Sequence, residues 1–133
     1  MSNFEYKLQI LEHHLDSLGH VNNAVYLELF EQARWDFITK GGYGIDQFIK
    51  LQKAPVVLEV NMRFKKELIN REFVTIRTTN SDYSGKVFKM TQEMIKDDGS
   101  VACIADFTVG FMDLAKRKLI NPTEEWLKAV HVQ

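Results

Sequence analysis

Apolar and polar side chains alternate along the first ten residues of the chain. The apolar positions are Phe4, Tyr6, Leu8 and Ile10, with charged or amide side chains between them. Because a period of two puts every second side chain on one face of a strand, this segment predicts a β-strand with one buried face. A polar loop over residues 12–22 separates it from a segment of different character.

Residues 23–40 predict a long helix. The segment has no glycine or proline and is rich in residues that favour helix, such as Leu, Ala, Glu and Gln. Its apolar side chains occupy most of the circumference, and such a helix is expected to be buried on most sides. Gly41 and Gly42 follow it, and glycine readily adopts the left-handed conformation found after many helices. A short helix is also expected over 45–52.

The remaining chain predicts strands and one more helix. Ser84-Gly85 and the run 97–100 mark turns, and the second of these makes its flanking strands a hairpin. Asn121 as N-cap and Pro122 in the first turn predict a C-terminal helix that ends near Val130. The predicted strands cover residues 56–65, 73–79, 86–96 and 101–111.

This element order predicts the fold class. Successive strands without intervening helices imply an antiparallel sheet, and the long helix would pack on one face of it, which gives an α+β fold. Since one sheet covers a single helix incompletely, we expect at least a dimer. A chain of 133 residues is long enough for a real core, so we expect one domain over 1–133.

Composition excludes several classes of protein. The formal net charge is −1 and no dense basic cluster is present, which argues against nucleic-acid binding. Cys103 is the only cysteine, so no disulfide can form within the chain. The first twenty residues hold no continuous apolar stretch, so we expect neither a signal peptide nor a membrane span, and the cytoplasm is the default location.

The loop before the long helix carries the candidate chemistry. Asp16 could activate water as a base or attack an acyl carbon directly, although a carboxylate here could equally cap the helix or its own turn. Asn22 or Asn23 is expected to cap the helix with its side-chain oxygen. The remaining N–H groups and the positive end of the helix dipole could polarise a carbonyl oxygen.

Other polar residues have two interpretations each. His20 could orient water or line an acyl site, or it could be a structural hydrogen-bonding group. Tyr26 could line the acyl channel or pack in the core. Glu31 lies eight residues after Asn23, about 12 Å along a helix, so a solvated or salt-bridged role is favoured unless another subunit brings it to the site.

The sequence does not favour a metal site. His13 and His14 are adjacent, and on an extended strand they would point to opposite faces, which would prevent them from binding one ion together. Cys103 has an apolar strand phase and is expected in the core. No Gly-x-Ser-x-Gly nucleophile motif or phosphate-binding loop is present.

The loop and helix start also carry a family resemblance. The pattern Asp-x-x-Gly-His-Val-Asn-Asn-Ala-x-Tyr resembles that of the 4-hydroxybenzoyl-CoA thioesterase family of hotdog folds. It is most similar to the bacterial long-chain acyl-CoA thioesterase III branch, which also has His-Leu-Asp at 14–16. The strong match covers about residues 13–38. The matching positions are Asp16, Gly19, His20, Val21, Asn22, Asn23, Ala24 and Tyr26.

The resemblance implies a fold, an activity and a site. The fold is a hotdog, an antiparallel sheet wrapped around one long central helix, assembled as a homodimer or homotetramer. The activity is acyl-CoA hydrolysis without metal or redox cofactor. Asp16 matches the family's catalytic carboxylate, and the backbone N–H of Asn23 matches its donor to the thioester carbonyl. Of the two interpretations given above for His20 and for Tyr26, we expect contact with the substrate.

Coenzyme A carries phosphates, so basic residues are expected near the mouth of the site. Arg63, Lys65 and Lys66 are candidates, as is Lys86, although each could be a plain surface charge. The favoured function is a thioesterase for medium- or long-chain fatty acyl-CoA. The alternatives are an aromatic acyl-CoA or acyl-carrier-protein thioesterase and a non-catalytic acyl-CoA-binding hotdog. A hotdog dehydratase is disfavoured because its His-plus-acid motif is not seen.

Overall fold

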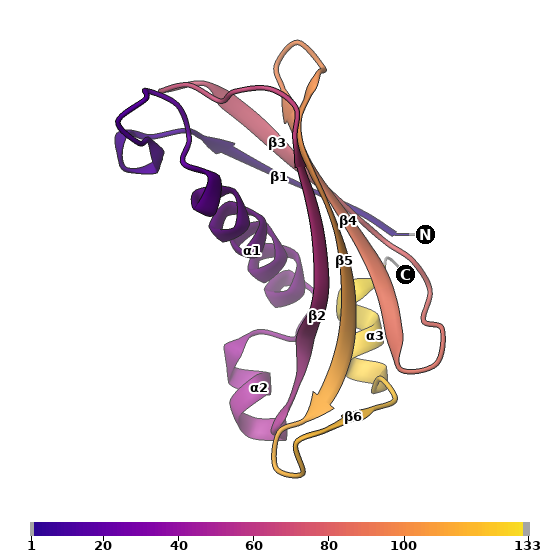
Figure 1. The fold of residues 1–133 in the computed structure, drawn as a ribbon. Coiled ribbons are helices and arrows are strands. Elements are labelled where there is room, and N and C mark those ends of the chain that lie inside the picture. The colour runs from indigo at the N-terminus through magenta and orange to yellow at the C-terminus, as the bar shows by residue number, and fades with distance from the viewer. Residues whose placement is uncertain (1, 132–133) are drawn as a thin grey trace.

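The computed structural model describes residues 2–131. They form one sheet with three helices on its concave side (Figure 1). The helices are α1 (Asn23–Lys40), α2 (Ile45–Leu51) and α3 (Glu124–Val130), and a short 3-10 helix, η1, covers Glu12–His14. No helix among residues 2–131 is long and apolar enough to cross a membrane. The strands are β1 (Ser2–Gln9), β2 (Lys53–Phe64), β3 (Phe73–Asn80), β4 (Val87–Lys96), β5 (Val101–Asp113) and β6 (Lys118–Ile120).

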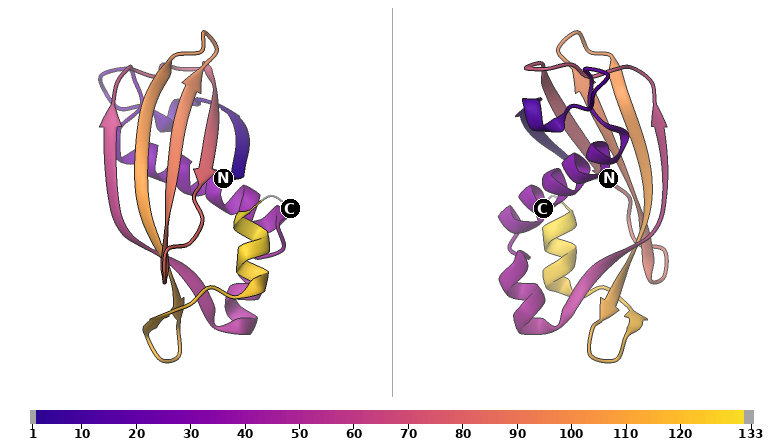
Figure 2. Two further views of the ribbon diagram at one scale, coloured as in Figure 1. Left: turned by 90° about the vertical axis from the view of Figure 1, so that its right-hand side faces the viewer. Right: turned by 60° about the vertical axis from the view of Figure 1, so that its left-hand side comes forward.

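The sheet is antiparallel and follows the order β1-β3-β4-β5-β2, with β6 paired to β5. It is long and curved, and α1 lies across its concave face (Figures 1 and 2). The predicted α+β arrangement is therefore confirmed. The strands β1 and β2 are its two edges.

The core lies between α1 and the sheet. Phe30 of α1 is fully buried and meets Phe107 of β5 edge-to-face, with ring centroids 6.3 Å apart. The opposite side of α1 is open in this chain, where Leu27 keeps 38% of its surface exposed. The expectation of burial on most sides was wrong for a single chain, because one sheet covers only one side of the helix.

The ends of α1 agree with the predicted capping residues, whereas the N-cap of α3 differs from the predicted one. Asn22 caps α1 by accepting from the Ala24 N–H, and Gly42 has the expected positive φ of 94° after it. The C-terminal helix begins later than predicted. Thr123, not Asn121, is its N-cap, since the Thr123 hydroxyl accepts from the Trp126 N–H. The elements η1 and β6 were not predicted, because three residues are too few to show a periodicity.

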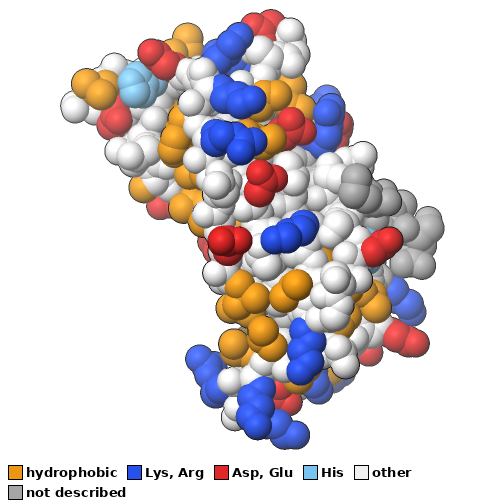
Figure 3. Space-filling view, turned by 45° about the vertical axis from the view of Figure 1, so that its right-hand side comes forward, with side chains coloured by type: hydrophobic (Ala, Val, Ile, Leu, Met, Phe, Trp, Pro, Cys, Tyr) orange, Lys and Arg blue, Asp and Glu red, His pale blue; other side chains and the backbone are white. Residues whose placement is uncertain are grey.

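The edge strand β2 is long and largely apolar. Four of its side chains remain substantially exposed, namely Val57, Leu58, Val60 and Phe64. An exposed apolar edge strand is a natural template for pairing with another chain. The outer face of the sheet differs, because acidic and basic side chains intermix there (Figure 3). Arg63, for example, lies 4.0 Å from Asp106 of the neighbouring strand.

Candidate active site

A tight turn holds Asp16. The Asp16 N–H donates to the carbonyl of His20, and the Gly19 N–H donates to the carbonyl of Asp16, both at 3.1 Å. Gly19 takes a φ of 87°, which suits a residue without a side chain. One carboxylate oxygen, Oδ1, accepts from the Leu18 N–H at 2.8 Å. Asp16 therefore caps its own turn, and its second oxygen makes no protein hydrogen bond among residues 2–131.

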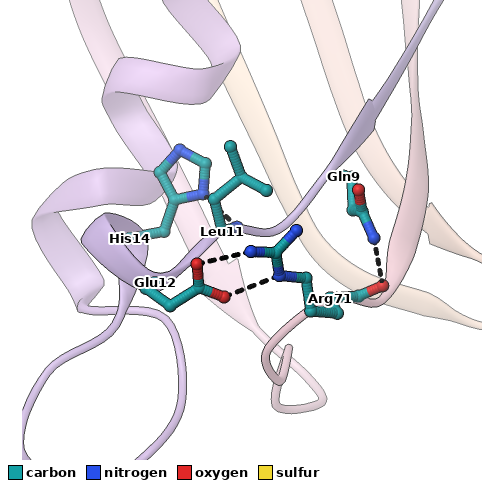
Figure 4. A network of polar contacts seen from close by, with 5 residues as sticks. All are labelled: Gln9, Leu11, Glu12, His14 and Arg71. Carbon is teal, nitrogen blue, oxygen red and sulfur yellow. Dashed lines mark hydrogen bonds and ion pairs between the residues drawn. The ribbon is translucent and has the colours of Figure 1, made fainter.

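This loop is tied to the connection between β2 and β3. The Val21 N–H donates to the Leu68 carbonyl at 3.0 Å, and His20 forms a β-bridge with Ile69. Nearby, Glu12 of η1 binds Arg71 through two hydrogen bonds of 2.7 Å each (Figure 4). These links fix the loop against residues 65–72, so two segments far apart in sequence form one wall.

His14 also helps to hold the Asp16 loop in place. His14 Nδ1 accepts from the Leu11 N–H at 2.9 Å (Figure 4), and the His14 carbonyl accepts from the Asn22 N–H. The pKa of His14 is lowered, mainly by burial and then by the neighbouring His13. The two rings lie on η1 with centroids 4.1 Å apart, so the expected extended geometry was wrong. Residues 2–131 hold no group of three or more potential metal ligands.

The start of α1 faces the Asp16 turn. With Asn22 as the cap, Asn23 is the first helical residue, and its N–H forms no hydrogen bond among residues 2–131. The first N–H groups of a helix have no partner within the helix and carry its positive dipole end. A carbonyl oxygen placed here would therefore meet an available donor and a favourable field.

A pocket of about 420 Å³ opens between these segments. Six of the predicted site residues line it. The pocket thus contains two carboxylates, those of Asp16 and Glu67, an unbonded helix N–H and two lysines within one concavity. The six predicted residues are Asp16, His20, Asn23, Tyr26, Lys65 and Lys66.

Tyr26 belongs to both the core and the pocket. It is only 4% exposed and packs edge-to-face on Phe64, with ring centroids 5.1 Å apart. Burial raises the pKa of Tyr26 to about 12, so its hydroxyl stays protonated at neutral pH. The two roles left open for this residue are therefore compatible.

Two predicted basic residues lie outside this pocket. Arg63 is on the outer face beside Asp106. Lys86 directly precedes Val87, which pairs with Gly110, whereas Phe64 at the pocket pairs with Cys103. Since residues 103 and 110 of β5 are separated by about 23 Å of strand, Lys86 lies at the far end of the sheet in this chain. Its role in binding stays a prediction.

Cys103 and Glu31 lie where the sequence predicted them, in the core and at the surface. Cys103 is fully buried, and burial raises its pKa to about 12, as expected of a core thiol. Glu31 is exposed and lines a second pocket farther along α1.

Three residues of the first pocket were not predicted. They are Leu18, Phe64 and Glu67, and Val21 and Asn22 of the family pattern also line the pocket. Leu18 is 76% exposed and Phe64 is 53% exposed, so both present apolar surface to solvent at the pocket. In the sequence they look like an ordinary loop residue and an ordinary strand residue. Only the folding of 64–67 over the Asp16 loop gives them a common location.

A curved antiparallel sheet around one long helix, with a pocket at the start of that helix, defines the hotdog class of proteins. The chain belongs to the thioesterase-like superfamily, whose family model matches residues 11–130. The predicted family, hotdog fold and thioesterase class are thereby confirmed.

Individual relatives agree with this placement. The long-chain acyl-CoA thioesterase FadM of Escherichia coli K12 is 29% identical over 118 residues, which are 86% of each chain. The chloroplastic acyl-acyl carrier protein thioesterase ATL3 of Arabidopsis thaliana is 28% identical over 115 residues, or 80% of this chain and 60% of that protein. The Staphylococcus aureus protein SAV2348, solved in complex with CoA, superposes with a TM-score of 0.89 at 18% identity. That match covers 97% of this chain and 82% of the other.

Proposed function

We propose that this protein hydrolyses medium- or long-chain fatty acyl-CoA to a free acid and coenzyme A, with Asp16 as base or nucleophile. One observation carries the proposal: the Asp16 carboxylate and the unbonded N–H of Asn23 line the same pocket. The name of the Escherichia coli relative supports the choice of a long acyl chain.

The proposed mechanism divides the work between these two groups. The Asn23 N–H and the helix dipole would bind the thioester carbonyl and stabilise the oxyanion, which is typically worth about 3–4 kcal/mol in the transition state. As a base, Asp16 would take a proton from water while the hydroxyl adds to the carbonyl carbon. As a nucleophile, it would form an acyl anhydride that water then cleaves. In both routes the thiolate of coenzyme A leaves and acquires a proton.

The rest of the pocket suits the substrate. Phe64, Tyr26 and Leu18 offer apolar surface for the first part of an acyl chain, and His20 lies beside them. Lys65 and Lys66 both donate their backbone N–H groups to the Ala102 carbonyl, at 2.8 and 3.0 Å, which fixes their backbone at the rim. Two cationic side chains here would attract the phosphates of coenzyme A.

The active unit is proposed to be a homodimer formed through β2, with a homotetramer as the larger alternative. The exposed apolar edge of β2 is the support for this pairing. Antiparallel pairing would bring the Phe64 end of one strand toward the Lys53 end of the other. Lys86 lies near that second end, so the pairing would move it toward the partner's pocket. One domain over 1–133 and a cytoplasmic location remain predictions.

Two alternatives keep specific support. The Arabidopsis relative is an acyl-carrier-protein thioesterase, so the carrier could be that protein instead of coenzyme A. A non-catalytic acyl-CoA-binding protein is the other alternative, because Asp16 also has a structural role as the cap of its own turn. An aromatic acyl group is a third possibility for the substrate.

The test is thiol release from acyl-CoAs of two to eighteen carbons and benzoyl-CoA, by the wild type and Asp16→Asn. The variant should lose about 100-fold or more in kcat/KM while folding and acyl-CoA binding persist. Asp46→Asn is the matched control, because Asp46 lies in the first turn of α2, outside the pocket. It should keep wild-type activity.

Each alternative has its own result. Binding of acyl-CoA without turnover by the wild type would reject the enzyme and leave the binding protein. A higher kcat/KM for the same acyl group on carrier protein would replace coenzyme A as the carrier. Faster release from benzoyl-CoA than from any fatty acyl-CoA would favour the aromatic substrate.

A further inference from the structure

A second pocket lies along the later part of α1. It has a volume of about 310 Å³, at the lower end of the range for ligand pockets. Its wall is mainly apolar, with Trp35, Phe48 and Val56 among the lining residues, and Arg34 is its one cationic residue. Arg34 is eleven residues after Asn23, about 16 Å along the helix, and the two pockets share no lining residue.

A buried polar network fixes Arg34 at this pocket. Gln92 is fully buried, and its Nε2 donates to the Phe30 carbonyl at 3.1 Å and to the Thr78 hydroxyl at 3.0 Å. These bonds orient the Gln92 Oε1 toward Arg34, whose Nη1 donates to it at 3.1 Å. The guanidinium carbon also lies 4.8 Å from the centre of the Phe107 ring.

The guanidinium is only partly satisfied. It carries five N–H donors, and one of them is used by Gln92. Among residues 2–131 no carboxylate lies within 4.0 Å of Arg34, and burial lowers its pKa. A cation held in apolar surroundings without an ion-pair partner would be stabilised by a carboxylate ligand that accepts its free N–H groups.

Glu31 is the carboxylate that acts on the Arg34 guanidinium from within the pocket. It also lines the pocket, one turn before Arg34, and its charge partly offsets the effect of burial on the Arg34 pKa. Its side chain is exposed and lies beyond ion-pair distance, so it acts on the guanidinium only at longer range. An anion that enters the pocket would therefore be repelled by Glu31 and attracted by Arg34.

We infer that this second pocket binds an apolar chain that ends in a carboxylate, with the carboxylate on the Arg34 guanidinium. The inference rests on the proposed function for its choice of ligand, because a free fatty acid is the product of that reaction. The apolar wall would hold the chain, and the guanidinium would distinguish an acid from an uncharged chain of the same length.

Calorimetric binding of decanoate and of decanol tests this inference without turnover. Wild type should bind decanoate about tenfold more tightly than decanol, as expected for a charge-assisted hydrogen bond in a partly buried site. Arg34→Met, which keeps an apolar side chain of similar length, should bind the two ligands equally. Arg34→Lys should keep a preference for decanoate, weaker than that of the wild type.

Two further variants leave Arg34 in place, so the inference stays testable if Arg34→Met does not fold. Glu31→Gln should tighten decanoate binding and leave decanol binding unchanged. Val57→Trp fills the pocket from β2 and should weaken both ligands. Because Val57 also lies on the β2 edge proposed to pair in the homodimer, ligand binding is compared at the same oligomeric state, measured by sedimentation. Equal binding of decanoate and decanol by the wild type would overturn the inference. Undiminished preference for decanoate in Arg34→Met, or decanoate binding unaffected by Val57→Trp, would overturn it as well.

This binding test and the test of the proposed function can fail independently. Loss of the decanoate preference in Arg34→Met supports the second pocket even if no acyl-CoA is hydrolysed. Hydrolysis that depends on Asp16, with no decanoate preference, would retain the thioesterase and remove the role of Arg34.

Discussion

The two pockets along α1 differ in how they are built. The pocket at the start of the helix takes its proposed catalytic groups from a short contiguous stretch, because Asp16, His20, Asn23 and Tyr26 lie within eleven residues of one another, and residues 64–67 add one further wall. The pocket around Arg34 takes its wall from α1, α2, β2, β4, β5 and α3. A turn and a helix cap can form from local interactions, whereas a wall drawn from six elements exists only when the whole sheet has folded around the helix.

The polar networks beside the two pockets differ in burial. Glu12 and Arg71 form a bidentate pair on the surface, and both side chains are 59% exposed. Such pairs typically contribute only about 0–1 kcal/mol, so this one mainly helps to set the path of the loop. Gln92 is fully buried, and its side chain forms all of its hydrogen bonds with other protein groups. Breaking this network would leave polar groups unsatisfied in the core. Disruption near Arg34 should therefore affect stability, and disruption near Asp16 should affect activity.

The largest expected effect on stability comes from the core between the pockets. Phe30→Ala removes a fully buried ring that meets Phe107, and should lower the free energy of unfolding by about 3–5 kcal/mol. Denaturant unfolding measures this loss. Glu28→Ala, at an exposed position of the same helix, should stay within about 0.5 kcal/mol of the wild type. Similar losses in both variants would show that the buried face of α1 does not dominate stability.

A medium effect is expected where α1 begins. Asn22→Ala removes the side-chain acceptor of the Ala24 N–H and should cost about 1 kcal/mol of stability. It should also lower kcat/KM by about tenfold or more, because small displacements of a carbonyl-binding donor reduce catalysis strongly.

The matched variant for this cap is Thr123→Ala, which removes the corresponding cap of α3. It should cost a similar amount of stability and leave kcat/KM unchanged, since α3 contributes nothing to the first pocket. An equal loss of activity in both variants would mean that the effect of Asn22→Ala arises from general destabilisation.

The smallest effect concerns pH. His14 Nδ1 can accept from the Leu11 N–H only when that nitrogen is unprotonated, and burial lowers the pKa of His14 below its ordinary value of 6.5. A lowered folded-state pKa gives stability that is present above pH 6.5 and is lost as the pH falls through the folded-state value. Unfolding free energies at pH 7 and pH 5 should therefore differ less in His14→Gln than in wild type.

His13→Gln is the control for this pH effect. It changes the adjacent exposed imidazole, which accepts no bond from Leu11, and should retain most of the wild-type difference between the two pH values. A wild-type pH dependence that persists unchanged in His14→Gln would assign it to other groups.

Much of the fold could be predicted from the sequence because its signals are local. The absence of glycine and proline between Asn23 and Lys40 predicted a helix with the bounds that α1 has. Gly85 and Gly99 both take a positive φ at the predicted turns. The start of α3 was placed too early, because Asn121 and Thr123 are both good N-caps and only the bond to Trp126 distinguishes them. The η1 geometry of His13 and His14 was also missed, since one turn of 3-10 helix leaves no periodic pattern.

The sequence by itself determined the strands β1 to β5, the central helix and the Asp16 turn, because period, propensity and capping act between residues close in the chain. It also carried the family pattern at 16–26. Only the tertiary structure decided that Lys65, Lys66 and Glu67 meet that turn and that Lys86 lies at the other end of the sheet. Only the tertiary structure, likewise, placed Gln92 of β4 against Arg34 of α1. These contacts depend on strand order and register, which are set by the packing of the sheet around α1 and leave no local signal.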